Sequence, residues 1–434
     1  MSPNTVAIAD VVMSRCDELA ACSEDPECIT RRYLSPPMHD VHDRLSGWMR
    51  TANLTTRIDN AGNLIGRREG TIPTDGASSS ENPAPNKNPT HNKSTVPRAL
   101  LVGSHLDTVP GGGRYDGVLG VLMGLALVEL LGDTPLPFHI DVVGFSEEEG
   151  VRFSKPYLGS SAMVGEFQAE WLERQDADGT TLSRAIVDFG LAPDCLSDSA
   201  YSPEEVIGFI EPHLEQGPVL ESCGSPVGVV SAIAGQTRLR LNFTGEAAHA
   251  GTTPMQGRRD ALVSSAAFIR TVSDLGQRVE GLRATVGQLQ IVPNAPNVIP
   301  GSVELSLDVR HPEDEVREQA IKELLVLGEK IGQADGTTFS VLEETPEAAV
   351  VMGSQLKELL SQAVVESGYA KVELPSGAGH DAVMMAKRFP TAMLFLRHPG
   401  GVSHHPDERV ERDDVAVGIE VLGRFVERLA GCGD

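Results

Sequence analysis

The sequence has no long apolar run and no closely spaced pair of cysteines. No stretch reaches the roughly 18 apolar residues of a membrane-spanning helix, and the N-terminus has no basic patch followed by an uninterrupted apolar segment. Six cysteines are scattered over 434 residues without a Cys-x-x-Cys pair, which in a chain of this size is typical of reduced thiols. We therefore expect a cytoplasmic protein without a membrane partner.

Basic residues are also scarce. Lys and Arg number 36 against 61 Asp and Glu, which gives a net charge of −25. This charge argues against nucleic acid and anionic membranes as partners, but not against a small anionic substrate, because local cations in a cleft decide that. The length exceeds the size at which a single core stops growing, and an apolar fraction of 40% allows a full core. Two domains are therefore expected.

Strand and helix patterns alternate after the first hundred residues. Ala99–Gly103 and His139–Phe145 have the composition of buried strands, and Val118–Leu131 is typical of an apolar helix. This order predicts a parallel α/β sheet, whose ligand sites lie beyond the carboxyl ends of its strands. Before it, Thr71–Pro97 is rich in Pro, Ser, Asn, Thr and Lys. That composition predicts a disordered insertion, so His91 within it is not expected to bind a metal.

The pattern changes from about residue 228 onwards. Val303–Arg310 alternates strictly between apolar and polar residues, as in a half-buried strand, and Asp260–Ser273 and Glu313–Gln333 have helical patterns. These elements predict a small α+β domain inserted into the larger one. The expected division is a catalytic domain of residues 1–227 and 346–434, interrupted by a second domain of residues 228–345.

Five short segments combine histidines with carboxylates in the spacing of a two-metal hydrolase. Mixed imidazole and carboxylate ligands suit Zn²⁺ or Mn²⁺, and a carboxylate can bridge two such ions. Two ions about 3.5–4 Å apart can polarise a carbonyl and generate hydroxide near neutral pH, so hydrolysis of an amide-like bond is the first hypothesis. The segments are Gly103–Val109, Gly113–Gly117, Glu147–Gly150, His213–Gly217 and Ser403–Pro406.

Each of these segments has a simpler explanation when it is taken alone. His105 stands at a strand end near an aspartate, which is common in ordinary proteins, and Asp116 belongs to an Asp-Gly turn dipeptide. Glu147–Glu149 could be a solvated loop. The remaining histidines could be a core residue and a surface pair. Five such features at strand ends and glycine turns of one chain favour a metal site.

At these residues the chain resembles a family of dinuclear amidohydrolases. The family includes N-carbamoyl-L-amino-acid amidohydrolase, allantoate amidohydrolase, ureidoglycolate amidohydrolase and β-ureidopropionase, and it is kin to aminoacylases and carboxypeptidase G. The resemblance covers nearly the whole chain apart from Thr71–Pro97. The motifs that support it are Gly103–Val109, Glu147–Phe153, His213–Glu221, Ala248–Pro254, Asn297–Gly301 and Ser376–Asp381.

The resemblance implies a fold and a metal centre. The fold is a parallel-rich α/β catalytic domain like that of zinc exopeptidases, with an inserted ferredoxin-like domain that forms a homodimer. Each subunit would bind two divalent ions, Zn²⁺ or Mn²⁺. His404 is preferred to His405 because it directly follows the serine of the Ser-His-x-Pro motif. The implied ligands are His105, Asp116 and His213 for one ion, and Asp116, Glu149 and His404 for the other, with Asp116 bridging.

The resemblance also implies roles beside the metals. Glu148 falls at the position of the general base, which takes a proton from water and passes it to the leaving nitrogen. Asp107 would orient the first histidine. His249 would stabilise the oxyanion and reach the site of the neighbouring subunit. The implied substrate-binding positions are His249, Asn297 and Arg310 in the inserted domain, and Gln216 and Gly379 in the catalytic domain.

The substrate is expected to be a small anionic ureido compound. Ser23–Pro26, Arg114–Gly117, Pro137–Gly144 and Gly400–Glu408 look most like the allantoate branch, which acts in purine and ureide catabolism. N-carbamoyl-L-amino acids are the main alternative, followed by ureidoglycolate and the substrate of β-ureidopropionase. An aminopeptidase would need an acidic pocket for a free amine, whereas Arg310 offers a fixed fork for a carboxylate. A binding module that had lost activity would lack a ligand or the base, and none is missing.

Overall fold

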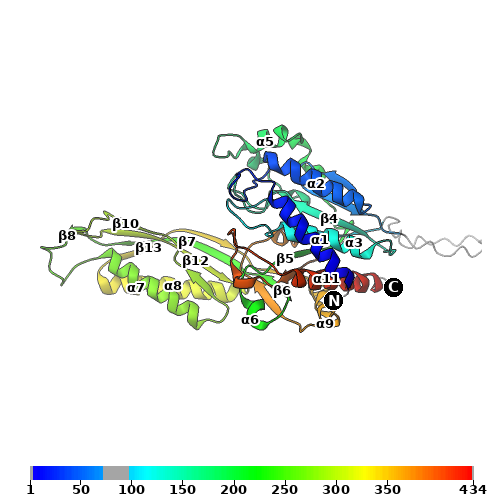
Figure 1. Ribbon diagram of the computed structural model, residues 1–434. Helices are drawn as coiled ribbons and strands as arrows, with labels where there is room; N and C mark the ends of the chain where they lie inside the picture. Colours follow the sequence, from blue (N-terminus) through cyan, green and yellow to red (C-terminus); the bar gives the residue numbers. More distant parts are fainter. Residues whose placement is uncertain (1–2, 72–96, 433–434) are drawn as a thin grey trace, which may run out of the picture. The chain divides into compact units, whose positions relative to one another are not determined.

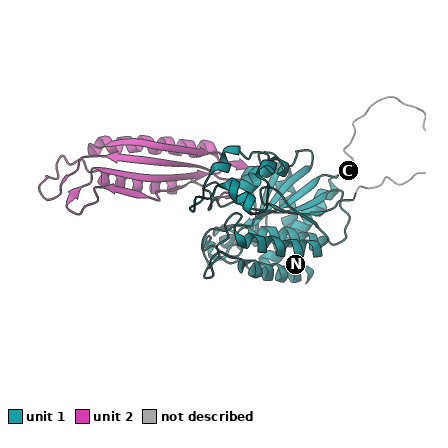
Figure 2. Ribbon diagram, turned by 90° about the horizontal axis from the view of Figure 1, so that it is seen from above, with its two compact units in different colours: residues 1–231, 352–374, 380–434 teal, residues 232–351, 375–379 magenta. Residues whose placement is uncertain are grey.

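The chain forms two compact units (Figure 2). The computed structural model describes residues 3–71 and 97–432. Unit 1 comprises residues 1–231, 352–374 and 380–434, and unit 2 comprises residues 232–351 and 375–379. The larger unit is therefore discontinuous in sequence. The insertion expected at Thr71–Pro97, with His91, lies almost wholly outside the described residues.

A nine-stranded mixed sheet lies mainly in unit 1, and Figure 1 labels its strands β4, β5 and β6. Its order is β1-β2-β4-β3-β5-β16-β6-β14, and β15 pairs with β6. The four neighbours β4, β3, β5 and β16 are parallel, and the pairs on either side of them are antiparallel. The strands are β1 (Thr55–Ile58), β2 (Leu64–Arg68), β3 (Ala99–His105), β4 (His139–Phe145), β5 (Val206–Leu214), β6 (Val227–Ile233), β14 (Val350–Val351), β15 (Glu373–Ser376) and β16 (Thr391–Leu396).

Helix α3 (Val118–Leu131) is enclosed by the rest of unit 1. It packs against β3, β4 and β5, and also against α1 (Pro3–Ala20) and α11 (Arg412–Gly431). Because it has neighbours on several sides, 12 of its 14 residues are buried, as its apolar sequence predicts. Helix α1 was not predicted from the sequence. Its buried stripe is narrow and only partly apolar, and consists of Thr5, Ala9, Val12, Cys16 and Leu19.

The remaining helices of unit 1 are shorter or lie at its surface. Helix α9 packs on α11 and β16, whereas α2 packs on β1 and β2. They are α2 (Pro36–Thr51), α4 (Leu158–Met163), α5 (Leu182–Asp188), α6 (Val219–Cys223), α9 (Ser354–Glu366) and α10 (Ala382–Met385), with 3₁₀ turns η1 (Ala169–Glu173), η2 (Pro193–Ser199) and η3 (Pro399–Gly401). Residues 380–388 contain only the single helical turn α10.

The parallel strands direct their carboxyl ends to one edge of the sheet. Strand β3 runs in register with β4, from Ala99 opposite His139 to His105 opposite Phe145. Every residue of both strands is buried. Strand β5 runs parallel to β3 on its other side. The segments that follow these strands therefore start close together, which is where α/β sheets hold their ligands.

Unit 2 consists of an antiparallel sheet and two helices. The sheet order is β10-β12-β7-β13, with β9 paired to β12, and both α7 and α8 pack on it. Strand β12 buries every second residue, as its alternating sequence predicts. The elements are β7 (Gly235–Thr244), α7 (Ala261–Arg278), β9 (Arg283–Thr285), β10 (Leu289–Val292), β12 (Ser302–His311), α8 (Asp314–Asp335) and β13 (Thr338–Glu347), and a separate pair is β8 (Ala248–His249) with β11 (Val298–Ile299).

Two further expectations concern the chain as a whole. Among residues 3–71 and 97–432, no helix has both the length and the apolar character needed to span a membrane. All six cysteines are free, as the scattered spacing predicts.

Candidate metal centre

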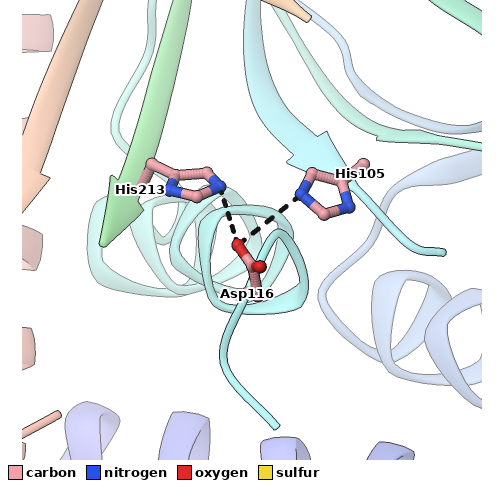
Figure 3. A group of neighbouring side chains, drawn as sticks. All are labelled: His105, Asp116 and His213. Carbon is pink, nitrogen blue, oxygen red and sulfur yellow. Dashed lines mark ion pairs between the residues drawn. The ribbon is translucent and has the colours of Figure 1, made fainter. Parts of the chain in front are cut away.

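Two histidines converge on one carboxylate in unit 1 (Figure 3). His105 is the last residue of β3, His213 lies near the end of β5, and Asp116 lies in the turn before α3. Nε2 of His213 lies 3.3 Å from Oδ1 of Asp116, and Nε2 of His105 lies 3.8 Å from the same oxygen. All three residues are at most 4% exposed. They form a buried group of three possible metal donors.

Hydrogen bonds on the far side of each ring point its free nitrogen towards Asp116. Nδ1 of His105 lies 3.0 Å from the carbonyl oxygen of Asp107, and Nδ1 of His213 lies 2.9 Å from that of Leu214. A carbonyl only accepts, so both Nδ1 atoms carry hydrogen, and the Nε2 lone pairs face the carboxylate in the neutral rings. Lone pairs on two nitrogens and a carboxylate oxygen directed at one point require a positive charge there.

A second donor group shares Asp116. Nε2 of His404 lies 3.4 Å from Oδ2 of Asp116 and 3.8 Å from Oε1 of Glu149. His404 stands in the loop after η3 with a φ of +56°, which a non-glycine residue rarely adopts. The neighbouring His405 instead places its Nδ1 3.6 Å from Oδ2 of Asp407. The structure thus brings His404, and not His405, to Asp116.

Glycine at position 117 lets the first group form. Its φ of +69° is in the left-handed region. A Cβ at this position would lie 2.5 Å from three atoms of the His105 ring. The Asp-Gly dipeptide, which alone suggests an ordinary turn, therefore also determines how closely the Asp116 turn approaches His105.

Asp107 connects the first histidine to the acidic triplet after β4. Its carboxylate accepts hydrogen bonds from the backbone N–H of Glu148, at 3.0 Å, and of Glu149, at 3.2 Å. Nδ1 of His105 lies nearer to the Asp107 carbonyl oxygen, at 3.0 Å, than to its carboxylate, at 3.4 Å. Asp107 therefore contacts His105 mainly through its backbone, and its side chain fixes the backbone of the triplet.

The three adjacent glutamates have different surroundings. Glu147 is fully buried and its Oε1 accepts a hydrogen bond from the N–H of Gly150. Glu148 and Glu149 form a third donor group with His105. Burial raises the pKa of Glu148 well above its ordinary value, opposed by the charge of His105 and reinforced by that of Glu149. Burial likewise raises the pKa of Glu149 to about 7.

The electrostatics of the centre favour cations. Burial alone would lower the pKa of His105, but the hydrogen bond to Asp107 and the charge of Glu148 raise it well above its ordinary value. Burial likewise opposes a raised pKa at His213, which the hydrogen bond and charge of Asp116 nevertheless produce. Carboxylates thus stabilise positive charge at both Nε2 atoms, whether it is a proton or a metal ion.

The donors fit divalent ions. Zinc binds imidazole nitrogen and carboxylate oxygen at about 2.0–2.2 Å, so two donors on a tetrahedral ion lie about 3.3 Å apart. The separations of Asp116 from His213, His404 and His105, 3.3, 3.4 and 3.8 Å, are close to that value. One carboxylate with both oxygens so placed can bridge two ions. The residues present therefore suit a two-ion centre with Zn²⁺ or Mn²⁺.

Two buried titratable residues to which the sequence analysis gave no role also lie here. Glu211 is fully buried and accepts hydrogen bonds from Oγ of Ser104, at 2.8 Å, and from the N–H of Ala382, at 2.9 Å. The ring of His380 lies 4.5 Å from that of His213. Together Glu211, His213 and His380 form another possible donor group. The sequence did contain a signal for Glu211. It stands two positions before His213 on a buried strand, and residues two apart on a strand share a face.

Gln216, expected to bind substrate, contacts the centre directly. Its Nε2 donates to Oδ1 and Oδ2 of Asp116, at 3.2 and 3.3 Å, and to Oγ of Ser403, at 2.8 Å. Like His404, it has a φ of +56°. Non-glycine residues in this region are held there by their surroundings, often at functional sites.

The other expected substrate residues lie in unit 2. His249 is exposed at the end of β8, and its Nδ1 accepts hydrogen bonds from the N–H groups of Gly251 and Thr252. The neutral ring therefore carries its hydrogen on Nε2 and can donate from there. The N–H of the next residue, Ala250, donates to the carbonyl of Asn297, so this hydrogen bond joins the segment that contains His249 to the segment that contains Asn297.

Arg310 and the segment ending at Gly379 are also joined within unit 2. The guanidinium donates to both carboxylate oxygens of Asp308, at 2.8 and 3.0 Å, and to the carbonyl of Gly377, at 2.7 Å. Residues 375–379 belong to unit 2, although Gly379 was expected in the catalytic domain. The hydrogen bond from Arg310, on β12, to Gly377 accounts for this placement.

Comparison with known proteins finds relatives named as amidohydrolases and amidases over nearly the whole chain. A curated N-carbamoyl-L-amino acid amidohydrolase from Geobacillus stearothermophilus is 39% identical over 93% of both chains. An allantoate amidohydrolase from Bacillus subtilis is 34% identical over 93% of both chains. A solved amidase of the hydantoinase/carbamoylase family from Burkholderia multivorans superposes with a TM-score of 0.85, at 30% identity over 97% of each chain.

The family model is consistent with these relatives. It describes peptidase family M20/M25/M40 and matches residues 101–428, a range that includes all five segments that hold the donor groups. This chain belongs to peptidase family M20/M25/M40.

Proposed function

We propose that this protein hydrolyses the ureido C–N bond of a small carboxylate substrate, with allantoate as the first candidate. The observation that carries the proposal is the convergence of two donor groups on Asp116, with the buried carboxyl of Glu148 beside them. Relatives named for hydrolysis of N-carbamoyl amino acids and of allantoate match over nearly the whole chain. Their names support a linear ureido compound rather than a peptide.

The proposed cofactor is a pair of divalent ions, Zn²⁺ or Mn²⁺, in each subunit. Its proposed ligands are His105, Asp116, Glu149, His213 and His404. When bound, such a pair polarises a carbonyl group and acidifies a water molecule, which a poorly electrophilic ureido carbonyl needs.

Glu148 is the proposed general base and acid. The role requires a carboxylate that lies beside the metal ligands and has a pKa near the working pH. Burial of Glu148 raises its pKa in that direction, and Asp107 fixes its backbone N–H. The carboxylate would take the proton of the attacking water and deliver it to the leaving nitrogen.

The proposed substrate-binding residues are His249, Asn297, Arg310, Gln216 and Gly379. Nε2–H of His249 would donate to the oxyanion of the tetrahedral intermediate, as its accepting Nδ1 allows. The guanidinium of Arg310 already holds Asp308 by two hydrogen bonds. A substrate carboxylate at Arg310 would therefore share the guanidinium with Asp308 or displace it.

N-carbamoyl-L-amino acids are the second candidate substrates. The specific observation in their favour is sequence identity. The chain is 39% identical to the Geobacillus stearothermophilus N-carbamoyl-L-amino acid amidohydrolase and 34% identical to the Bacillus subtilis allantoate amidohydrolase. Both substrates present a ureido group and a carboxylate. They differ in the second ureido group of allantoate, so the choice depends on which side chain the pocket accepts.

We also propose that the chain acts as a cytoplasmic homodimer through its inserted ferredoxin-like domain, residues 228–345. In unit 2, β13 forms one edge of the sheet, and eight of its ten residues, Thr338 and 341–347, are exposed. Val341 and Leu342 on it are 42% and 49% exposed. An edge strand with exposed apolar residues is suited to pairing with another chain.

A substrate panel tests the proposed activity. Purified protein loaded with Zn²⁺ or Mn²⁺ is given allantoate, a series of N-carbamoyl-L-amino acids and a dipeptide, and ammonia and free amine are measured. We expect ammonia from a ureido substrate, no dipeptide cleavage, and loss of activity with a chelator. The Glu148→Gln protein, prepared in the same way, controls for contaminating enzymes. Dipeptide cleavage with no ureido turnover would overturn the proposal.

A further inference from the structure

Glu408 lies close to the candidate metal centre but outside its donor groups. It follows His404 by four residues, in the loop between η3 and α11, and only 3% of it is exposed. Its Oε1 accepts hydrogen bonds from the backbone N–H of Tyr115 and of Asp116, both at 3.0 Å. Among the described residues, no group of possible metal donors includes Glu408.

The turn that contains Asp116 depends on this carboxylate. Its start is held by hydrogen bonds from Gly111 and Gly112 to Thr30, Ile29 and Val109. At its end the N–H groups of Tyr115 and Asp116 donate to Glu408, which lies 293 and 292 positions later in the chain. The position of the Asp116 backbone, and hence of its carboxylate, is thus set from the loop that also contains His404.

Gly113 makes room for this contact. A Cβ there would lie 2.2 Å from Oε1 of Glu408 and 2.4 Å from its Cβ and Cδ atoms. No side chain can occupy position 113 while Glu408 keeps its place. The turn is therefore shaped around the Glu408 carboxylate.

The cost of the arrangement indicates a role beyond packing. Oε2 of Glu408 is buried and has no hydrogen-bond partner among the described residues. An unpaired buried polar atom costs about 1–3 kcal/mol, so an apolar residue would fill this space at lower cost. What an apolar residue cannot do is accept two backbone N–H groups at Asp116.

We propose that Glu408 is a positioning residue that holds the backbone of Asp116, so that one carboxylate faces His105 and His213 with one oxygen and His404 with the other. The loop 402–408 then sets two of the three members of the second donor group, because it provides His404 and fixes Asp116. The inference rests on the proposed metal centre and predicts that metal affinity depends on hydrogen-bond acceptance at position 408. Partners of metal ligands typically change affinity by about 10–100-fold when they are removed.

Chelator competition for Zn²⁺ in the absence of substrate tests this role. Glu408→Ala should weaken binding of the ion by about 10–100-fold. Glu408→Gln, whose amide oxygen can still accept both N–H groups, should stay within about threefold of the wild-type protein. A residue that only fills space would give the opposite order, because alanine leaves a small cavity whereas glutamine buries an unpaired amide.

A second variant guards against misfolding of Glu408→Ala. Gly113→Ala leaves Glu408 in the chain but places a Cβ where its carboxylate lies, so it should lower zinc affinity in the same way. Wild-type affinity in both Glu408→Ala and Gly113→Ala, or equal loss in Glu408→Gln and Glu408→Ala, would overturn the inference. Asp116→Ala is the reference variant. If it binds zinc with wild-type affinity, the proposed metal centre is wrong. If only Asp116→Ala loses zinc affinity, the metal centre stands and the positioning role of Glu408 is rejected.

Discussion

Single residues in this protein serve the centre with more than one group. The carboxylate of Asp116 faces His213 and His404 with different oxygens, and its backbone N–H is held by Glu408. Asp107 uses its carbonyl for His105 and its carboxylate for the acidic triplet. A substitution at such a residue therefore tests a single role only if it changes one of these groups and leaves the others in place.

Glu148→Gln changes one function of the acidic triplet. Glutamine has the same shape but cannot accept the proton of water, so turnover should fall by about 100- to 10,000-fold while bound metal stays near the wild-type amount. Activity assays and elemental analysis of the same preparation measure both. Glu149→Gln is the matched neighbour and should lose metal. If Glu149→Gln kept its metal and Glu148→Gln lost it, the two roles would be exchanged.

His42, on α2, should make unit 1 sensitive to acid. Burial, followed by the charges of His39 and Arg31, lowers its pKa to about 3. Between the unfolded value of about 6.5 and this folded value, the unfolded chain binds a proton that the folded chain does not, so stability is lost as pH falls. From about pH 7.5 to about pH 5 the loss from this residue is about 2 kcal/mol.

His42→Leu should remove that contribution. Both ring nitrogens are buried without a hydrogen-bond partner among the described residues, so an apolar side chain leaves no polar group unpaired. The thermal midpoint of the variant should drop less than that of the wild-type protein between the two pH values. Identical drops in differential scanning calorimetry would show that His42 titrates normally in the folded protein.

At the scale of elements, the centre is built from segments that follow parallel strands. β3 ends in His105, β5 places His213 near its end, and the acidic triplet follows β4. The fourth parallel strand, β16, leads into the loop that contains His404. The sheet holds these starting points rigidly, and short turns with unusual backbone angles bring the side chains together.

Gly117→Ala tests the turn between β3 and α3. Alanine there adds strain at a φ of +69° and a contact of 2.5 Å with the His105 ring. We expect a lower melting temperature and weaker zinc binding. Gly111→Ala is the matched control, because it has the same φ of +69° but no atom within 4 Å of its Cβ. Equal zinc affinity in the two variants would mean that the contact with His105 is unimportant.

At the scale of the molecule, the expected site residues are divided between the two units. The donor groups, Glu148 and Gln216 lie in unit 1, whereas His249, Asn297, Arg310 and Gly379 lie in unit 2. If the protein is a homodimer in which His249 serves the partner's site, the activity of each site depends on residues of both subunits.

Mixing two inactive variants tests that arrangement. Glu148→Gln and His249→Ala should each be nearly inactive, but a mixed dimer would have one site with both defects and one with neither. Random reassortment of equal amounts gives about half mixed dimers, so activity should recover to roughly a quarter of the wild-type value. Mass spectrometry confirms that mixed dimers have formed. If they form without recovery, His249 acts within its own subunit or not at all.

The sequence by itself determined the elements whose patterns are local. The continuous apolar runs of β3, β4 and α3 and the strict alternation of β12 are visible without the structure, since burial imposes them on neighbouring residues. Chemical motifs were equally visible. Through the family resemblance that they carry, they named the residues that the structure gathers into both donor groups, and they favoured His404 over His405, whose Nδ1 instead lies near Asp407.

Only the tertiary structure decided how distant segments support one another. The carboxylate of Glu408 reaches the turn at Asp116 across 292 residues, Glu211 lies between Ser104 and Ala382, and Arg310 meets Gly377. A periodic sequence pattern cannot predict such contacts, because each contact depends on where two distant segments meet in space and not on the residues adjacent in the sequence. The sequence thus contains the donors and the strands that present them, whereas the packing of the loops determines which backbone groups hold those donors in place.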